Sequence, residues 1–348
     1  MASVATQNFN DPDSYFDAIH AMKGSGFVLP KRGVFGAELT RVEFDSLWLQ
    51  SGRETIARCG HISVDIDRRP IGFLTYDGSP AVVVSGAELP TDYLIFYSPG
   101  ATQYQCHSGS FCWSAMSLSP QDLDDASRRI TDRTISVPPS TQHIKPPAAQ
   151  FARLKRLHRE AVLLGQSSID VLTNSVSARH LEHDLTLAMI SCLTAGEEKH
   201  FHRAWHRHKH IMDRFEQWIE AHPDQPAHLL EVCADLDISA RSLTLCCRDH
   251  LGMSPMRYLW LRRMHLARRE LRRAEATATV TTVALSFGFS HLGRFSVEYR
   301  TLFGELPSQT LARPRLIREV GSTRLKYLSL PELDSQVVPF GANVRLRA

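Results

Sequence analysis

The sequence lacks the features that mark membrane-embedded and secreted proteins. None of its 348 residues lies in an apolar run that approaches the roughly 18 residues a transmembrane helix needs. The opening residues, MASVATQNFNDPDSYFD, have neither the basic segment nor the apolar core of a signal peptide. We therefore expect a cytoplasmic chain that does not enter a membrane.

Cysteine is scarce, and its spacing does not fit a structural metal site. The seven cysteines are scattered, odd in number and never arranged as C-x-x-C. They are Cys59, Cys106, Cys112, Cys192, Cys233, Cys246 and Cys247. This usage argues for a reducing compartment and against a disulfide framework or a zinc site. We expect no bound metal and no cofactor.

Lysine is absent from one stretch near the C-terminus that is rich in arginine. Between Ala240 and Arg315 the chain has thirteen arginines and five acidic residues, a balance of +8, whereas the whole chain carries +3. A guanidinium group binds phosphate through two parallel hydrogen bonds, so concentrated arginine favours a nucleic-acid partner. A solvated basic face is the alternative.

In the same stretch an apolar helical pattern is broken by a turn and then resumes. Gly288 stands where a helix end needs a residue that tolerates positive φ. Ser290 is placed to cap a second helix, which would begin at His291 and end at Gly304. Two helices joined by a glycine-containing turn form a helix-turn-helix, although a single copy fits an ordinary helical hairpin equally well.

This layout occurs twice in the chain. Val232 matches Val283 and Ser239 matches Ser290, each pair 51 residues apart. After one extra residue in the second copy, the matches continue with Leu243 and Phe295, Cys247 and Tyr299, Leu251 and Phe303, Gly252 and Gly304, and Pro255 and Pro307. The repeat predicts two helix-turn-helix units in tandem, the first motif at 229–252 and the second motif at 280–303.

The segment between the motifs, PMRYLWLRRMHLARRELRR (255–273), reads as one helix that begins at Pro255. Its apolar residues share one face: Leu261, Met264, Ala267 and Leu271. Roughly 18 residues span about 27 Å, close to the ~34 Å between successive major-groove windows on one side of B-DNA. A monomer could therefore place both motifs on one double-stranded site.

These residues carry a resemblance to a known family. GFSHLGRFSVEYRTLFGELP, the linker from Arg262 to Leu271 and the first motif resemble the AraC/XylS family of bacterial transcription regulators over Ile211 to Pro314. The resemblance implies binding to double-stranded promoter DNA and, usually, activation through contact with RNA polymerase. It also implies control by an N-terminal effector or dimerisation domain, and a regulator rather than an enzyme.

The phase of each second helix predicts which side chains face DNA. Those pointing away from the core, or lying on the flank, are Arg241, Ser242, Thr244, Leu245 and Arg248 in the first motif, and Gly293, Arg294, Val297, Arg300 and Thr301 in the second. Arginine suits guanine or phosphate, and the apolar residues suit thymine methyl groups or recognition of DNA shape. The linker arginines Arg262, Arg263, Arg268 and Arg269 are expected to contact phosphates.

The N-terminal part has a β pattern. Short alternating runs such as His61–Ile66, separated by Gly- and Pro-containing breaks, argue for a barrel or sandwich. With this C-terminus the arrangement resembles the cupin-like sensor domain of AraC-type regulators. The histidines His20, His61, His107 and His143 provide no H-x-H pair, so an enzymatic cupin is not expected. Phe96, Tyr104, His107 and Trp113 could line an effector pocket; core packing is the alternative for each.

After a proline-rich stretch (136–147), the apolar spacing predicts two amphipathic helices. They could mediate a homodimer or simply cover the barrel. The predicted architecture is thus a cupin-like effector domain (1–145), a helical connector (146–205), an all-α DNA-binding domain with tandem motifs (206–316) and a C-terminal extension (317–348).

Two other functions are compatible with a helix-turn-helix module of this kind. A DNA-repair methyltransferase fused to this module would need a four-cysteine zinc cluster and a P-C-H-R nucleophile, and the chain has neither. An architectural or protein-binding helix-turn-helix module without effector response remains the alternative.

Overall fold

The computed structural model describes residues 2–75, 81–167, 172, 174–199, 203–223, 227–273 and 278–312. These residues fall into two compact units, divided within one helix between Arg262 and Arg263. The first unit contains all the described strands and the first motif, and the second contains the second motif. The predicted C-terminal extension lies outside the described residues.

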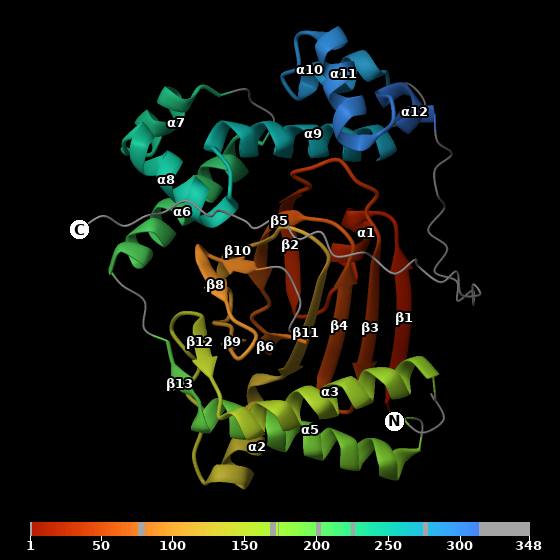
Figure 1. The fold of residues 1–348 in the computed structure, drawn as a ribbon, viewed down its shortest axis with the longest axis vertical. Helices are drawn as coiled ribbons and strands as arrows, with labels where there is room; N and C mark the ends of the chain where they lie inside the picture. The colour runs from red at the N-terminus through yellow and green to blue at the C-terminus, as the bar shows by residue number, and fades with distance from the viewer. Residues whose placement is uncertain are drawn as a thin grey trace. The chain divides into compact units, whose positions relative to one another are not determined.

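The strands of the first unit form two antiparallel sheets (Figure 1). The large sheet has the order β1 (Ser3–Phe9), β3 (Ala37–Glu43), β4 (Trp48–Glu54), β11 (Phe111–Leu118), β6 (Arg69–Leu74), β9 (Leu94–Phe96), β12 (Gln142–Lys145), β13 (Glu197–Glu198). The small sheet has the order β2 (Met22–Val28), β5 (Arg58–Val64), β10 (Thr102–His107), β7 (Val82–Val84), β8 (Ala87–Leu89).

Side-chain alternation puts the large sheet between two apolar cores. On β11, Trp113 and Ala115 contribute to the core shared with the small sheet. Met116 and Leu118 contribute to a second core on the other side. The predicted β structure is confirmed, although β5, which contains His61, is buried at six of its seven positions and does not alternate. The predicted cupin-like barrel is not confirmed, because within the described residues no hydrogen-bonded ladder joins the two sheets.

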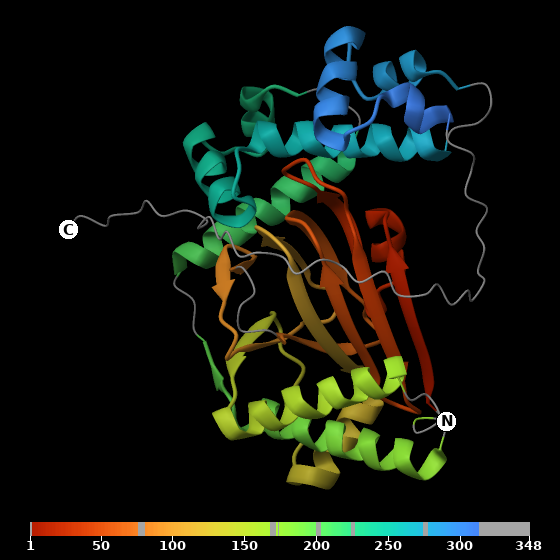
Figure 2. The same ribbon diagram turned by 45° about the vertical axis from the view of Figure 1, so that its right-hand side comes forward.

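Helices cover the outer face of the large sheet. They are α2 (Pro120–Thr131), α3 (Ala148–Ser167) and α5 (Ser175–Ala195), and the short α1 (Pro12–Asp17) packs against the strands β1, β2 and β3. Figures 1 and 2 show α3 and α5 side by side. Leu154 and Leu185 of these helices are fully buried, and each such leucine stabilises the fold by roughly 1.5–3 kcal/mol. The two predicted amphipathic helices therefore exist, and they cover a sheet.

The remaining helices have the predicted order. They are α6 (Arg203–Ala221), α7 (Leu229–Asp235), α8 (Ala240–Leu251), α9 (Pro255–Arg273), α10 (Val280–Ser286), α11 (Leu292–Phe303) and α12 (Pro307–Ala312). The predicted linker stripe of α9 is fully buried from Leu261 to Leu271. Over the part of the chain that the structure describes, no helix is long and apolar enough to cross a bilayer.

One disulfide departs from the sequence analysis, which argued against a disulfide framework. Cys59 and Cys106 are bonded, and their Cα atoms lie 4.1 Å apart. They are direct cross-strand partners on β5 and β10. The two cysteines are 47 positions apart in the sequence, and only the register of the small sheet brings them together, so the sequence did not predict this pairing.

A buried ion network lies at the edge of the inter-sheet core. Glu54 has no exposed surface, and its carboxylate accepts hydrogen bonds from Arg58 at 2.5 and 3.0 Å. His107 Nε2 lies 3.2 Å from the same carboxylate and the Tyr15 hydroxyl donates to it at 3.3 Å. Burial alone raises the pKa of Glu54, but Arg58 and His107 together outweigh it and lower that pKa to about 2.

Replacing Glu54 with Gln should lower the free energy of unfolding by about 3–5 kcal/mol, because the Arg58 charge stays buried without its counter-ion. Asp184→Asn is the matched control, since it breaks a half-exposed pair with Arg153 that contributes at most about 1 kcal/mol. Urea denaturation measures both. The pKa of Glu54 is lowered on folding, so its contribution is present above pH 4.5 and is lost as the pH falls towards 2. Equal effects of the two variants at pH 7 would contradict this account.

Candidate nucleic-acid interface

The two motifs make the same turn. Asp237 and Gly288, which are 51 residues apart, both have positive φ, 48° and 74°. In each turn the next backbone N–H donates to a carbonyl oxygen five residues back, Ile238 to Cys233 at 3.1 Å and Phe289 to Ala284 at 2.9 Å. These bonds satisfy carbonyls left free at a helix end. The predicted role of Gly288 is confirmed.

The starts of the two recognition helices, α8 and α11, differ by one residue. Ser239 caps α8, and its side chain accepts a hydrogen bond from the backbone N–H of Ser242. The corresponding cap predicted at Ser290 is wrong. His291 is the N-cap of α11 and makes no side-chain capping bond. The physical reason is the extra residue of the second copy, which lies between Ser290 and the helix and moves the serine out of reach.

The predicted DNA-facing residues of α8 lie on its outer surface. Arg241 and Arg248 are exposed, and Leu245 is exposed over 49% of its surface. Ser242 and Thr244 are half-buried on the flank. The opposite face is closed, with Leu243, Cys246, Cys247 and Leu251 buried. An exposed leucine between two arginines is what a helix that contacts bases and phosphates would offer.

The corresponding face of α11 is fully exposed. Gly293, Arg294, Val297, Arg300 and Thr301 are all exposed, and Val297 is exposed over 67% of its surface. A Cβ added at Gly293 would meet no atom within 4 Å. This face is therefore open over the length of the helix.

Arg294 has an intramolecular partner. Its Nε donates to Oε1 of Glu298 at 2.8 Å, although the arginine side chain is 75% exposed. Ion pairs between solvated side chains one helical turn apart are easily exchanged for another partner. The pairing therefore leaves the guanidinium available to an incoming base or phosphate.

Two of the four predicted linker arginines are bound within the second unit. Arg263 donates to the backbone oxygen of Phe287 at 3.5 Å. Arg268 pairs with Glu305 at 3.1 Å, with side-chain exposures of 19% and 11%. Arg269 is also half-buried. Arg263 and Arg268 thus hold the second motif on α9, and the phosphate contacts predicted for these three residues remain predictions.

The part of the chain that contains the two motifs is similar to known proteins. A family described as "Helix-turn-helix domain" matches residues 232–313. The "Probable thc operon regulatory protein" of Rhodococcus erythropolis is 42% identical over 95 residues, which are 27% of this chain and 29% of that protein. The "XylDLEGF operon transcriptional activator 2" of Pseudomonas putida is 38% identical over 101 residues, 29% of this chain and 64% of that protein.

A solved structure matches the same region. It is the crystal structure of a "probable AraC family transcriptional regulator" from Rhodopseudomonas palustris CGA009, 37% identical, with 30% of this chain and 99% of that chain covered and a TM-score of 0.28. The chain belongs to the AraC/XylS family. It spans less than two thirds of the length of the curated relatives named above.

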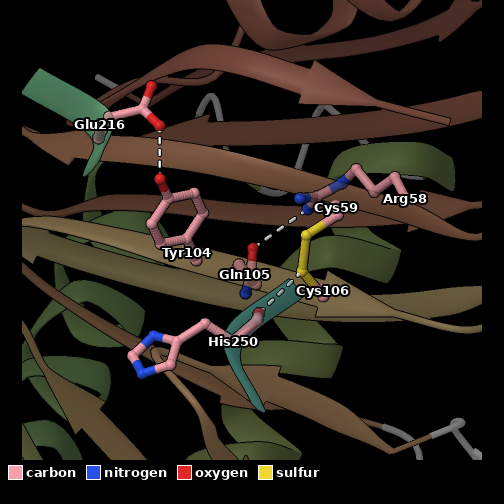
Figure 3. Close-up of a disulfide and its surroundings, with 7 residues drawn as sticks. All are labelled: Arg58, Cys59, Tyr104, Gln105, Cys106, Glu216 and His250. Carbon is pink, nitrogen blue, oxygen red and sulfur yellow. Dashed lines mark hydrogen bonds between the residues drawn. A yellow bond between two sulfur atoms is a disulfide. The ribbon is translucent and has the colours of Figure 1, made fainter. Parts of the chain in front are cut away.

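In this AraC/XylS-family protein a buried carboxylate joins the helices α6 and α9 to the small sheet. Glu216 of α6 is 2% exposed and accepts a hydrogen bond from the Tyr104 hydroxyl of β10 at 2.5 Å (Figure 3). Arg262 of α9 pairs with the same carboxylate. His61 Nδ1 of β5 lies 3.6 Å from it. Burial lowers the pKa of His61 more than the nearby Glu216 carboxylate raises it.

Arg262, the fourth linker arginine with a predicted phosphate contact, is part of this junction. Its side chain is only 11% exposed and is occupied by Glu216. In this arrangement the guanidinium faces the interior of the first unit. A phosphate contact by Arg262 would require the junction to open.

The four predicted effector residues do not form one pocket. A cavity of about 40 Å³ lies between the two sheets, and among the four only Trp113 lines it. Phe96 packs in the core on the helix side of the large sheet. Tyr104 is bound to Glu216, and His107 faces Glu54. The lining of this inter-sheet cavity includes Phe16, Ile62, Leu74, Ile95, Phe111 and Ala115.

Arg58 is a charged residue of this cavity that was not among the predicted site residues. It is 2% exposed and lines the cavity, where it also donates to the Gln105 side chain at 3.1 Å. Its Nη1 has no hydrogen-bond partner within the described residues. The four-residue spacing of Glu54 and Arg58 was the available signal, but only the turn between β4 and β5 makes it an ion pair.

Mutation can distinguish linker arginines that contact phosphate from those that stabilise the fold. Arg269→Gln should weaken binding to all DNA sequences alike and reduce the salt slope by about one if this side chain contacts phosphate. Arg268→Gln is the matched neighbour: it removes the partly buried ion pair with Glu305 and should destabilise the second unit by about 1–3 kcal/mol. Anisotropy titrations at several salt concentrations and thermal unfolding measure the two effects. An unchanged salt slope for Arg269→Gln would count against a DNA-facing linker.

Proposed function

We propose that this protein is a sequence-specific DNA-binding regulator that activates transcription. The observation that carries the proposal is the repeated motif, in which α8 and α11 each present an open face bearing arginines. The names of its relatives, which include transcriptional activators, support the same conclusion. RNA polymerase is the partner that activation requires.

The two recognition helices would enter successive major-groove segments of double-stranded promoter DNA. Arg241, Arg248 and Arg300 would bind phosphates or guanines, because all three are exposed. Leu245 and Val297 would contact thymine methyl groups. The 19 residues of α9 make it about 28 Å long, a length that suits two groove windows about one DNA turn apart.

The N-terminal part would control DNA binding and activation. The whole protein would act in the cytoplasm. We infer an effector domain over 1–145, a connector over 146–205 and a DNA-binding domain over 206–316. The connector helices α3 and α5 expose Leu163 and Val176 at 53% and 54%, and these apolar groups would support a homodimer.

A small-molecule effector would bind in the inter-sheet cavity. Its mostly apolar lining and the unpaired Nη1 of Arg58 suit a compact apolar molecule with a hydrogen-bond acceptor. About 40 Å³ holds only a few water molecules, so binding would require the two sheets to move apart. That movement would reach β5 and β10, which carry His61 and Tyr104 of the junction.

Arg294→Ala tests base reading directly. The variant should relax preference at one base position in the half-site of the second motif, by roughly 5- to 150-fold, and leave the other half-site unchanged. Arg241→Ala in α8 is the matched control and should affect only the first half-site. Glu298→Gln, which frees Arg294 from its ion pair, should not weaken binding. Selection from a randomised operator measures all three.

If Arg294→Ala lowers affinity evenly without changing the preferred bases, Arg294 does not read a base. It would then bind phosphate or serve only its pair with Glu298. If the unmodified protein itself shows no sequence preference, the protein is not a sequence-specific regulator.

A further inference from the structure

The disulfide between Cys59 and Cys106 lies where the small sheet meets the first recognition helix (Figure 3). Cys106 Sγ is 3.3 Å from the backbone oxygen of His250, in the last turn of α8. Both cysteines are buried, at 1% and 5% exposure. Strand β10 and helix α8 are in direct contact, so the sulfur pair belongs to the docking surface of the first motif.

The chemistry of this contact depends on the oxidation state of the sulfur. Carbonyl oxygens in the last turn of a helix lack an intrahelical donor, and the His250 oxygen is one of them. A thiol S–H can donate a hydrogen bond, whereas a disulfide sulfur carries no hydrogen. Reduction therefore creates a donor where the acceptor already lies at hydrogen-bonding distance.

Other polar atoms at this contact are buried without hydrogen bonds. The His250 side chain is 1% exposed, and within the described residues neither ring nitrogen has a hydrogen-bond partner. Gly86, with φ of 80°, lets the ring approach, since a Cβ there would lie 2.7 Å from it. Buried polar atoms without partners destabilise a contact. One added hydrogen bond can therefore shift the balance between docked and released α8.

We propose that the Cys59–Cys106 pair is a redox-sensitive contact that sets how firmly the first recognition helix is docked on the small sheet. In the reduced form the Cys106 thiol donates to the His250 oxygen and holds the C-terminus of α8. In the oxidised form that donor is absent and the helix is released more often. Because both sulfurs are buried beside α8, exchange with a reagent requires release, so docking protects the oxidation state in turn.

A dithiol can reduce this disulfide, and hydrogen peroxide can form it again. A dithiol reduces the pair by thiol–disulfide exchange: its two sulfurs form a disulfide, and Cys59 and Cys106 receive two electrons and two protons. Hydrogen peroxide reverses the step, as two thiols and one peroxide give one disulfide and two water molecules. Any effect on DNA affinity rests on the proposed function; the effect on docking does not.

Hydrogen exchange of the α8 backbone amides in the full chain tests the contact. After treatment with dithiothreitol, α8 should exchange roughly 2- to 5-fold more slowly than after peroxide, the size expected for one modest hydrogen bond. Mass spectrometry of alkylated peptides checks the oxidation state. Absence of the disulfide after peroxide, or identical exchange in both states, would overturn the proposal.

Three variants remove the disulfide but differ in the donor. Cys59→Ala keeps the Cys106 thiol and should match the reduced protein under both conditions. Cys106→Ala removes the donor and should match the oxidised protein. Cys106→Ser restores a donor and should again match the reduced protein, whereas Cys112→Ala, a cysteine outside the contact, should leave redox sensitivity intact.

Identical exchange in Cys59→Ala and Cys106→Ala would show that the thiol donor has no role. The Cys106→Ser variant guards against a general packing defect, because only the donor distinguishes it from the alanine change. Titrations with promoter DNA in the two oxidation states then test the regulatory link. If the protein binds no promoter, the proposed function is wrong, while the exchange experiment still decides the docking contact.

Discussion

The burial of one carboxylate is the constraint on which the junction of the first unit depends. A glutamate that is 2% exposed must be paired and hydrogen-bonded, because an isolated buried charge is strongly unfavourable. Glu216 meets this requirement through a strand residue, Tyr104, and a linker residue, Arg262. The small sheet and the helices α6 and α9 are therefore linked through a single functional group.

On α8, the residues that contact the small sheet are separate from those that we propose for DNA contact. The last turn of α8 faces the small sheet through His250, while Arg241 and Leu245 remain exposed on the opposite side. A change in the small sheet can therefore alter the mobility of α8 without covering the exposed surface that we propose for DNA. The cysteine pair lies on strands of that sheet, and the inter-sheet cavity borders it. The small sheet is therefore the route that we propose from a signal to the first motif.

Local patterns predicted the C-terminal region well. The positive φ of Gly288 and the buried stripe of α9 follow from glycine's backbone freedom and from helical periodicity, which operate within a few residues. The failure at Ser290 was a matter of one inserted residue. What could not be predicted was the pairing of Arg262 with Glu216, because a basic residue outside the stripe looks solvent-exposed until a distant carboxylate is placed beside it.

The N-terminal region shows the limits of alternation. The large sheet has apolar layers on both faces, so strands such as β9 are buried at every position. The sequence therefore could not show on which face of the sheet Phe96 packs. Its alternating strands were identified, but their grouping into two open sheets depends on long-range register. The Cys59–Cys106 pair and the Glu54–Arg58–His107 network depend on the same register and left no local signal.

The central claim is that both motifs engage one DNA site, and hydroxyl-radical footprinting of the full chain on its selected operator tests it most directly. The account predicts two protected windows on one face of the duplex, about 10 base pairs apart between centres. Substitution of α11 surface residues should remove one window and leave the other. A single window in the unmodified protein, or two that disappear together, would contradict independent engagement by the two motifs.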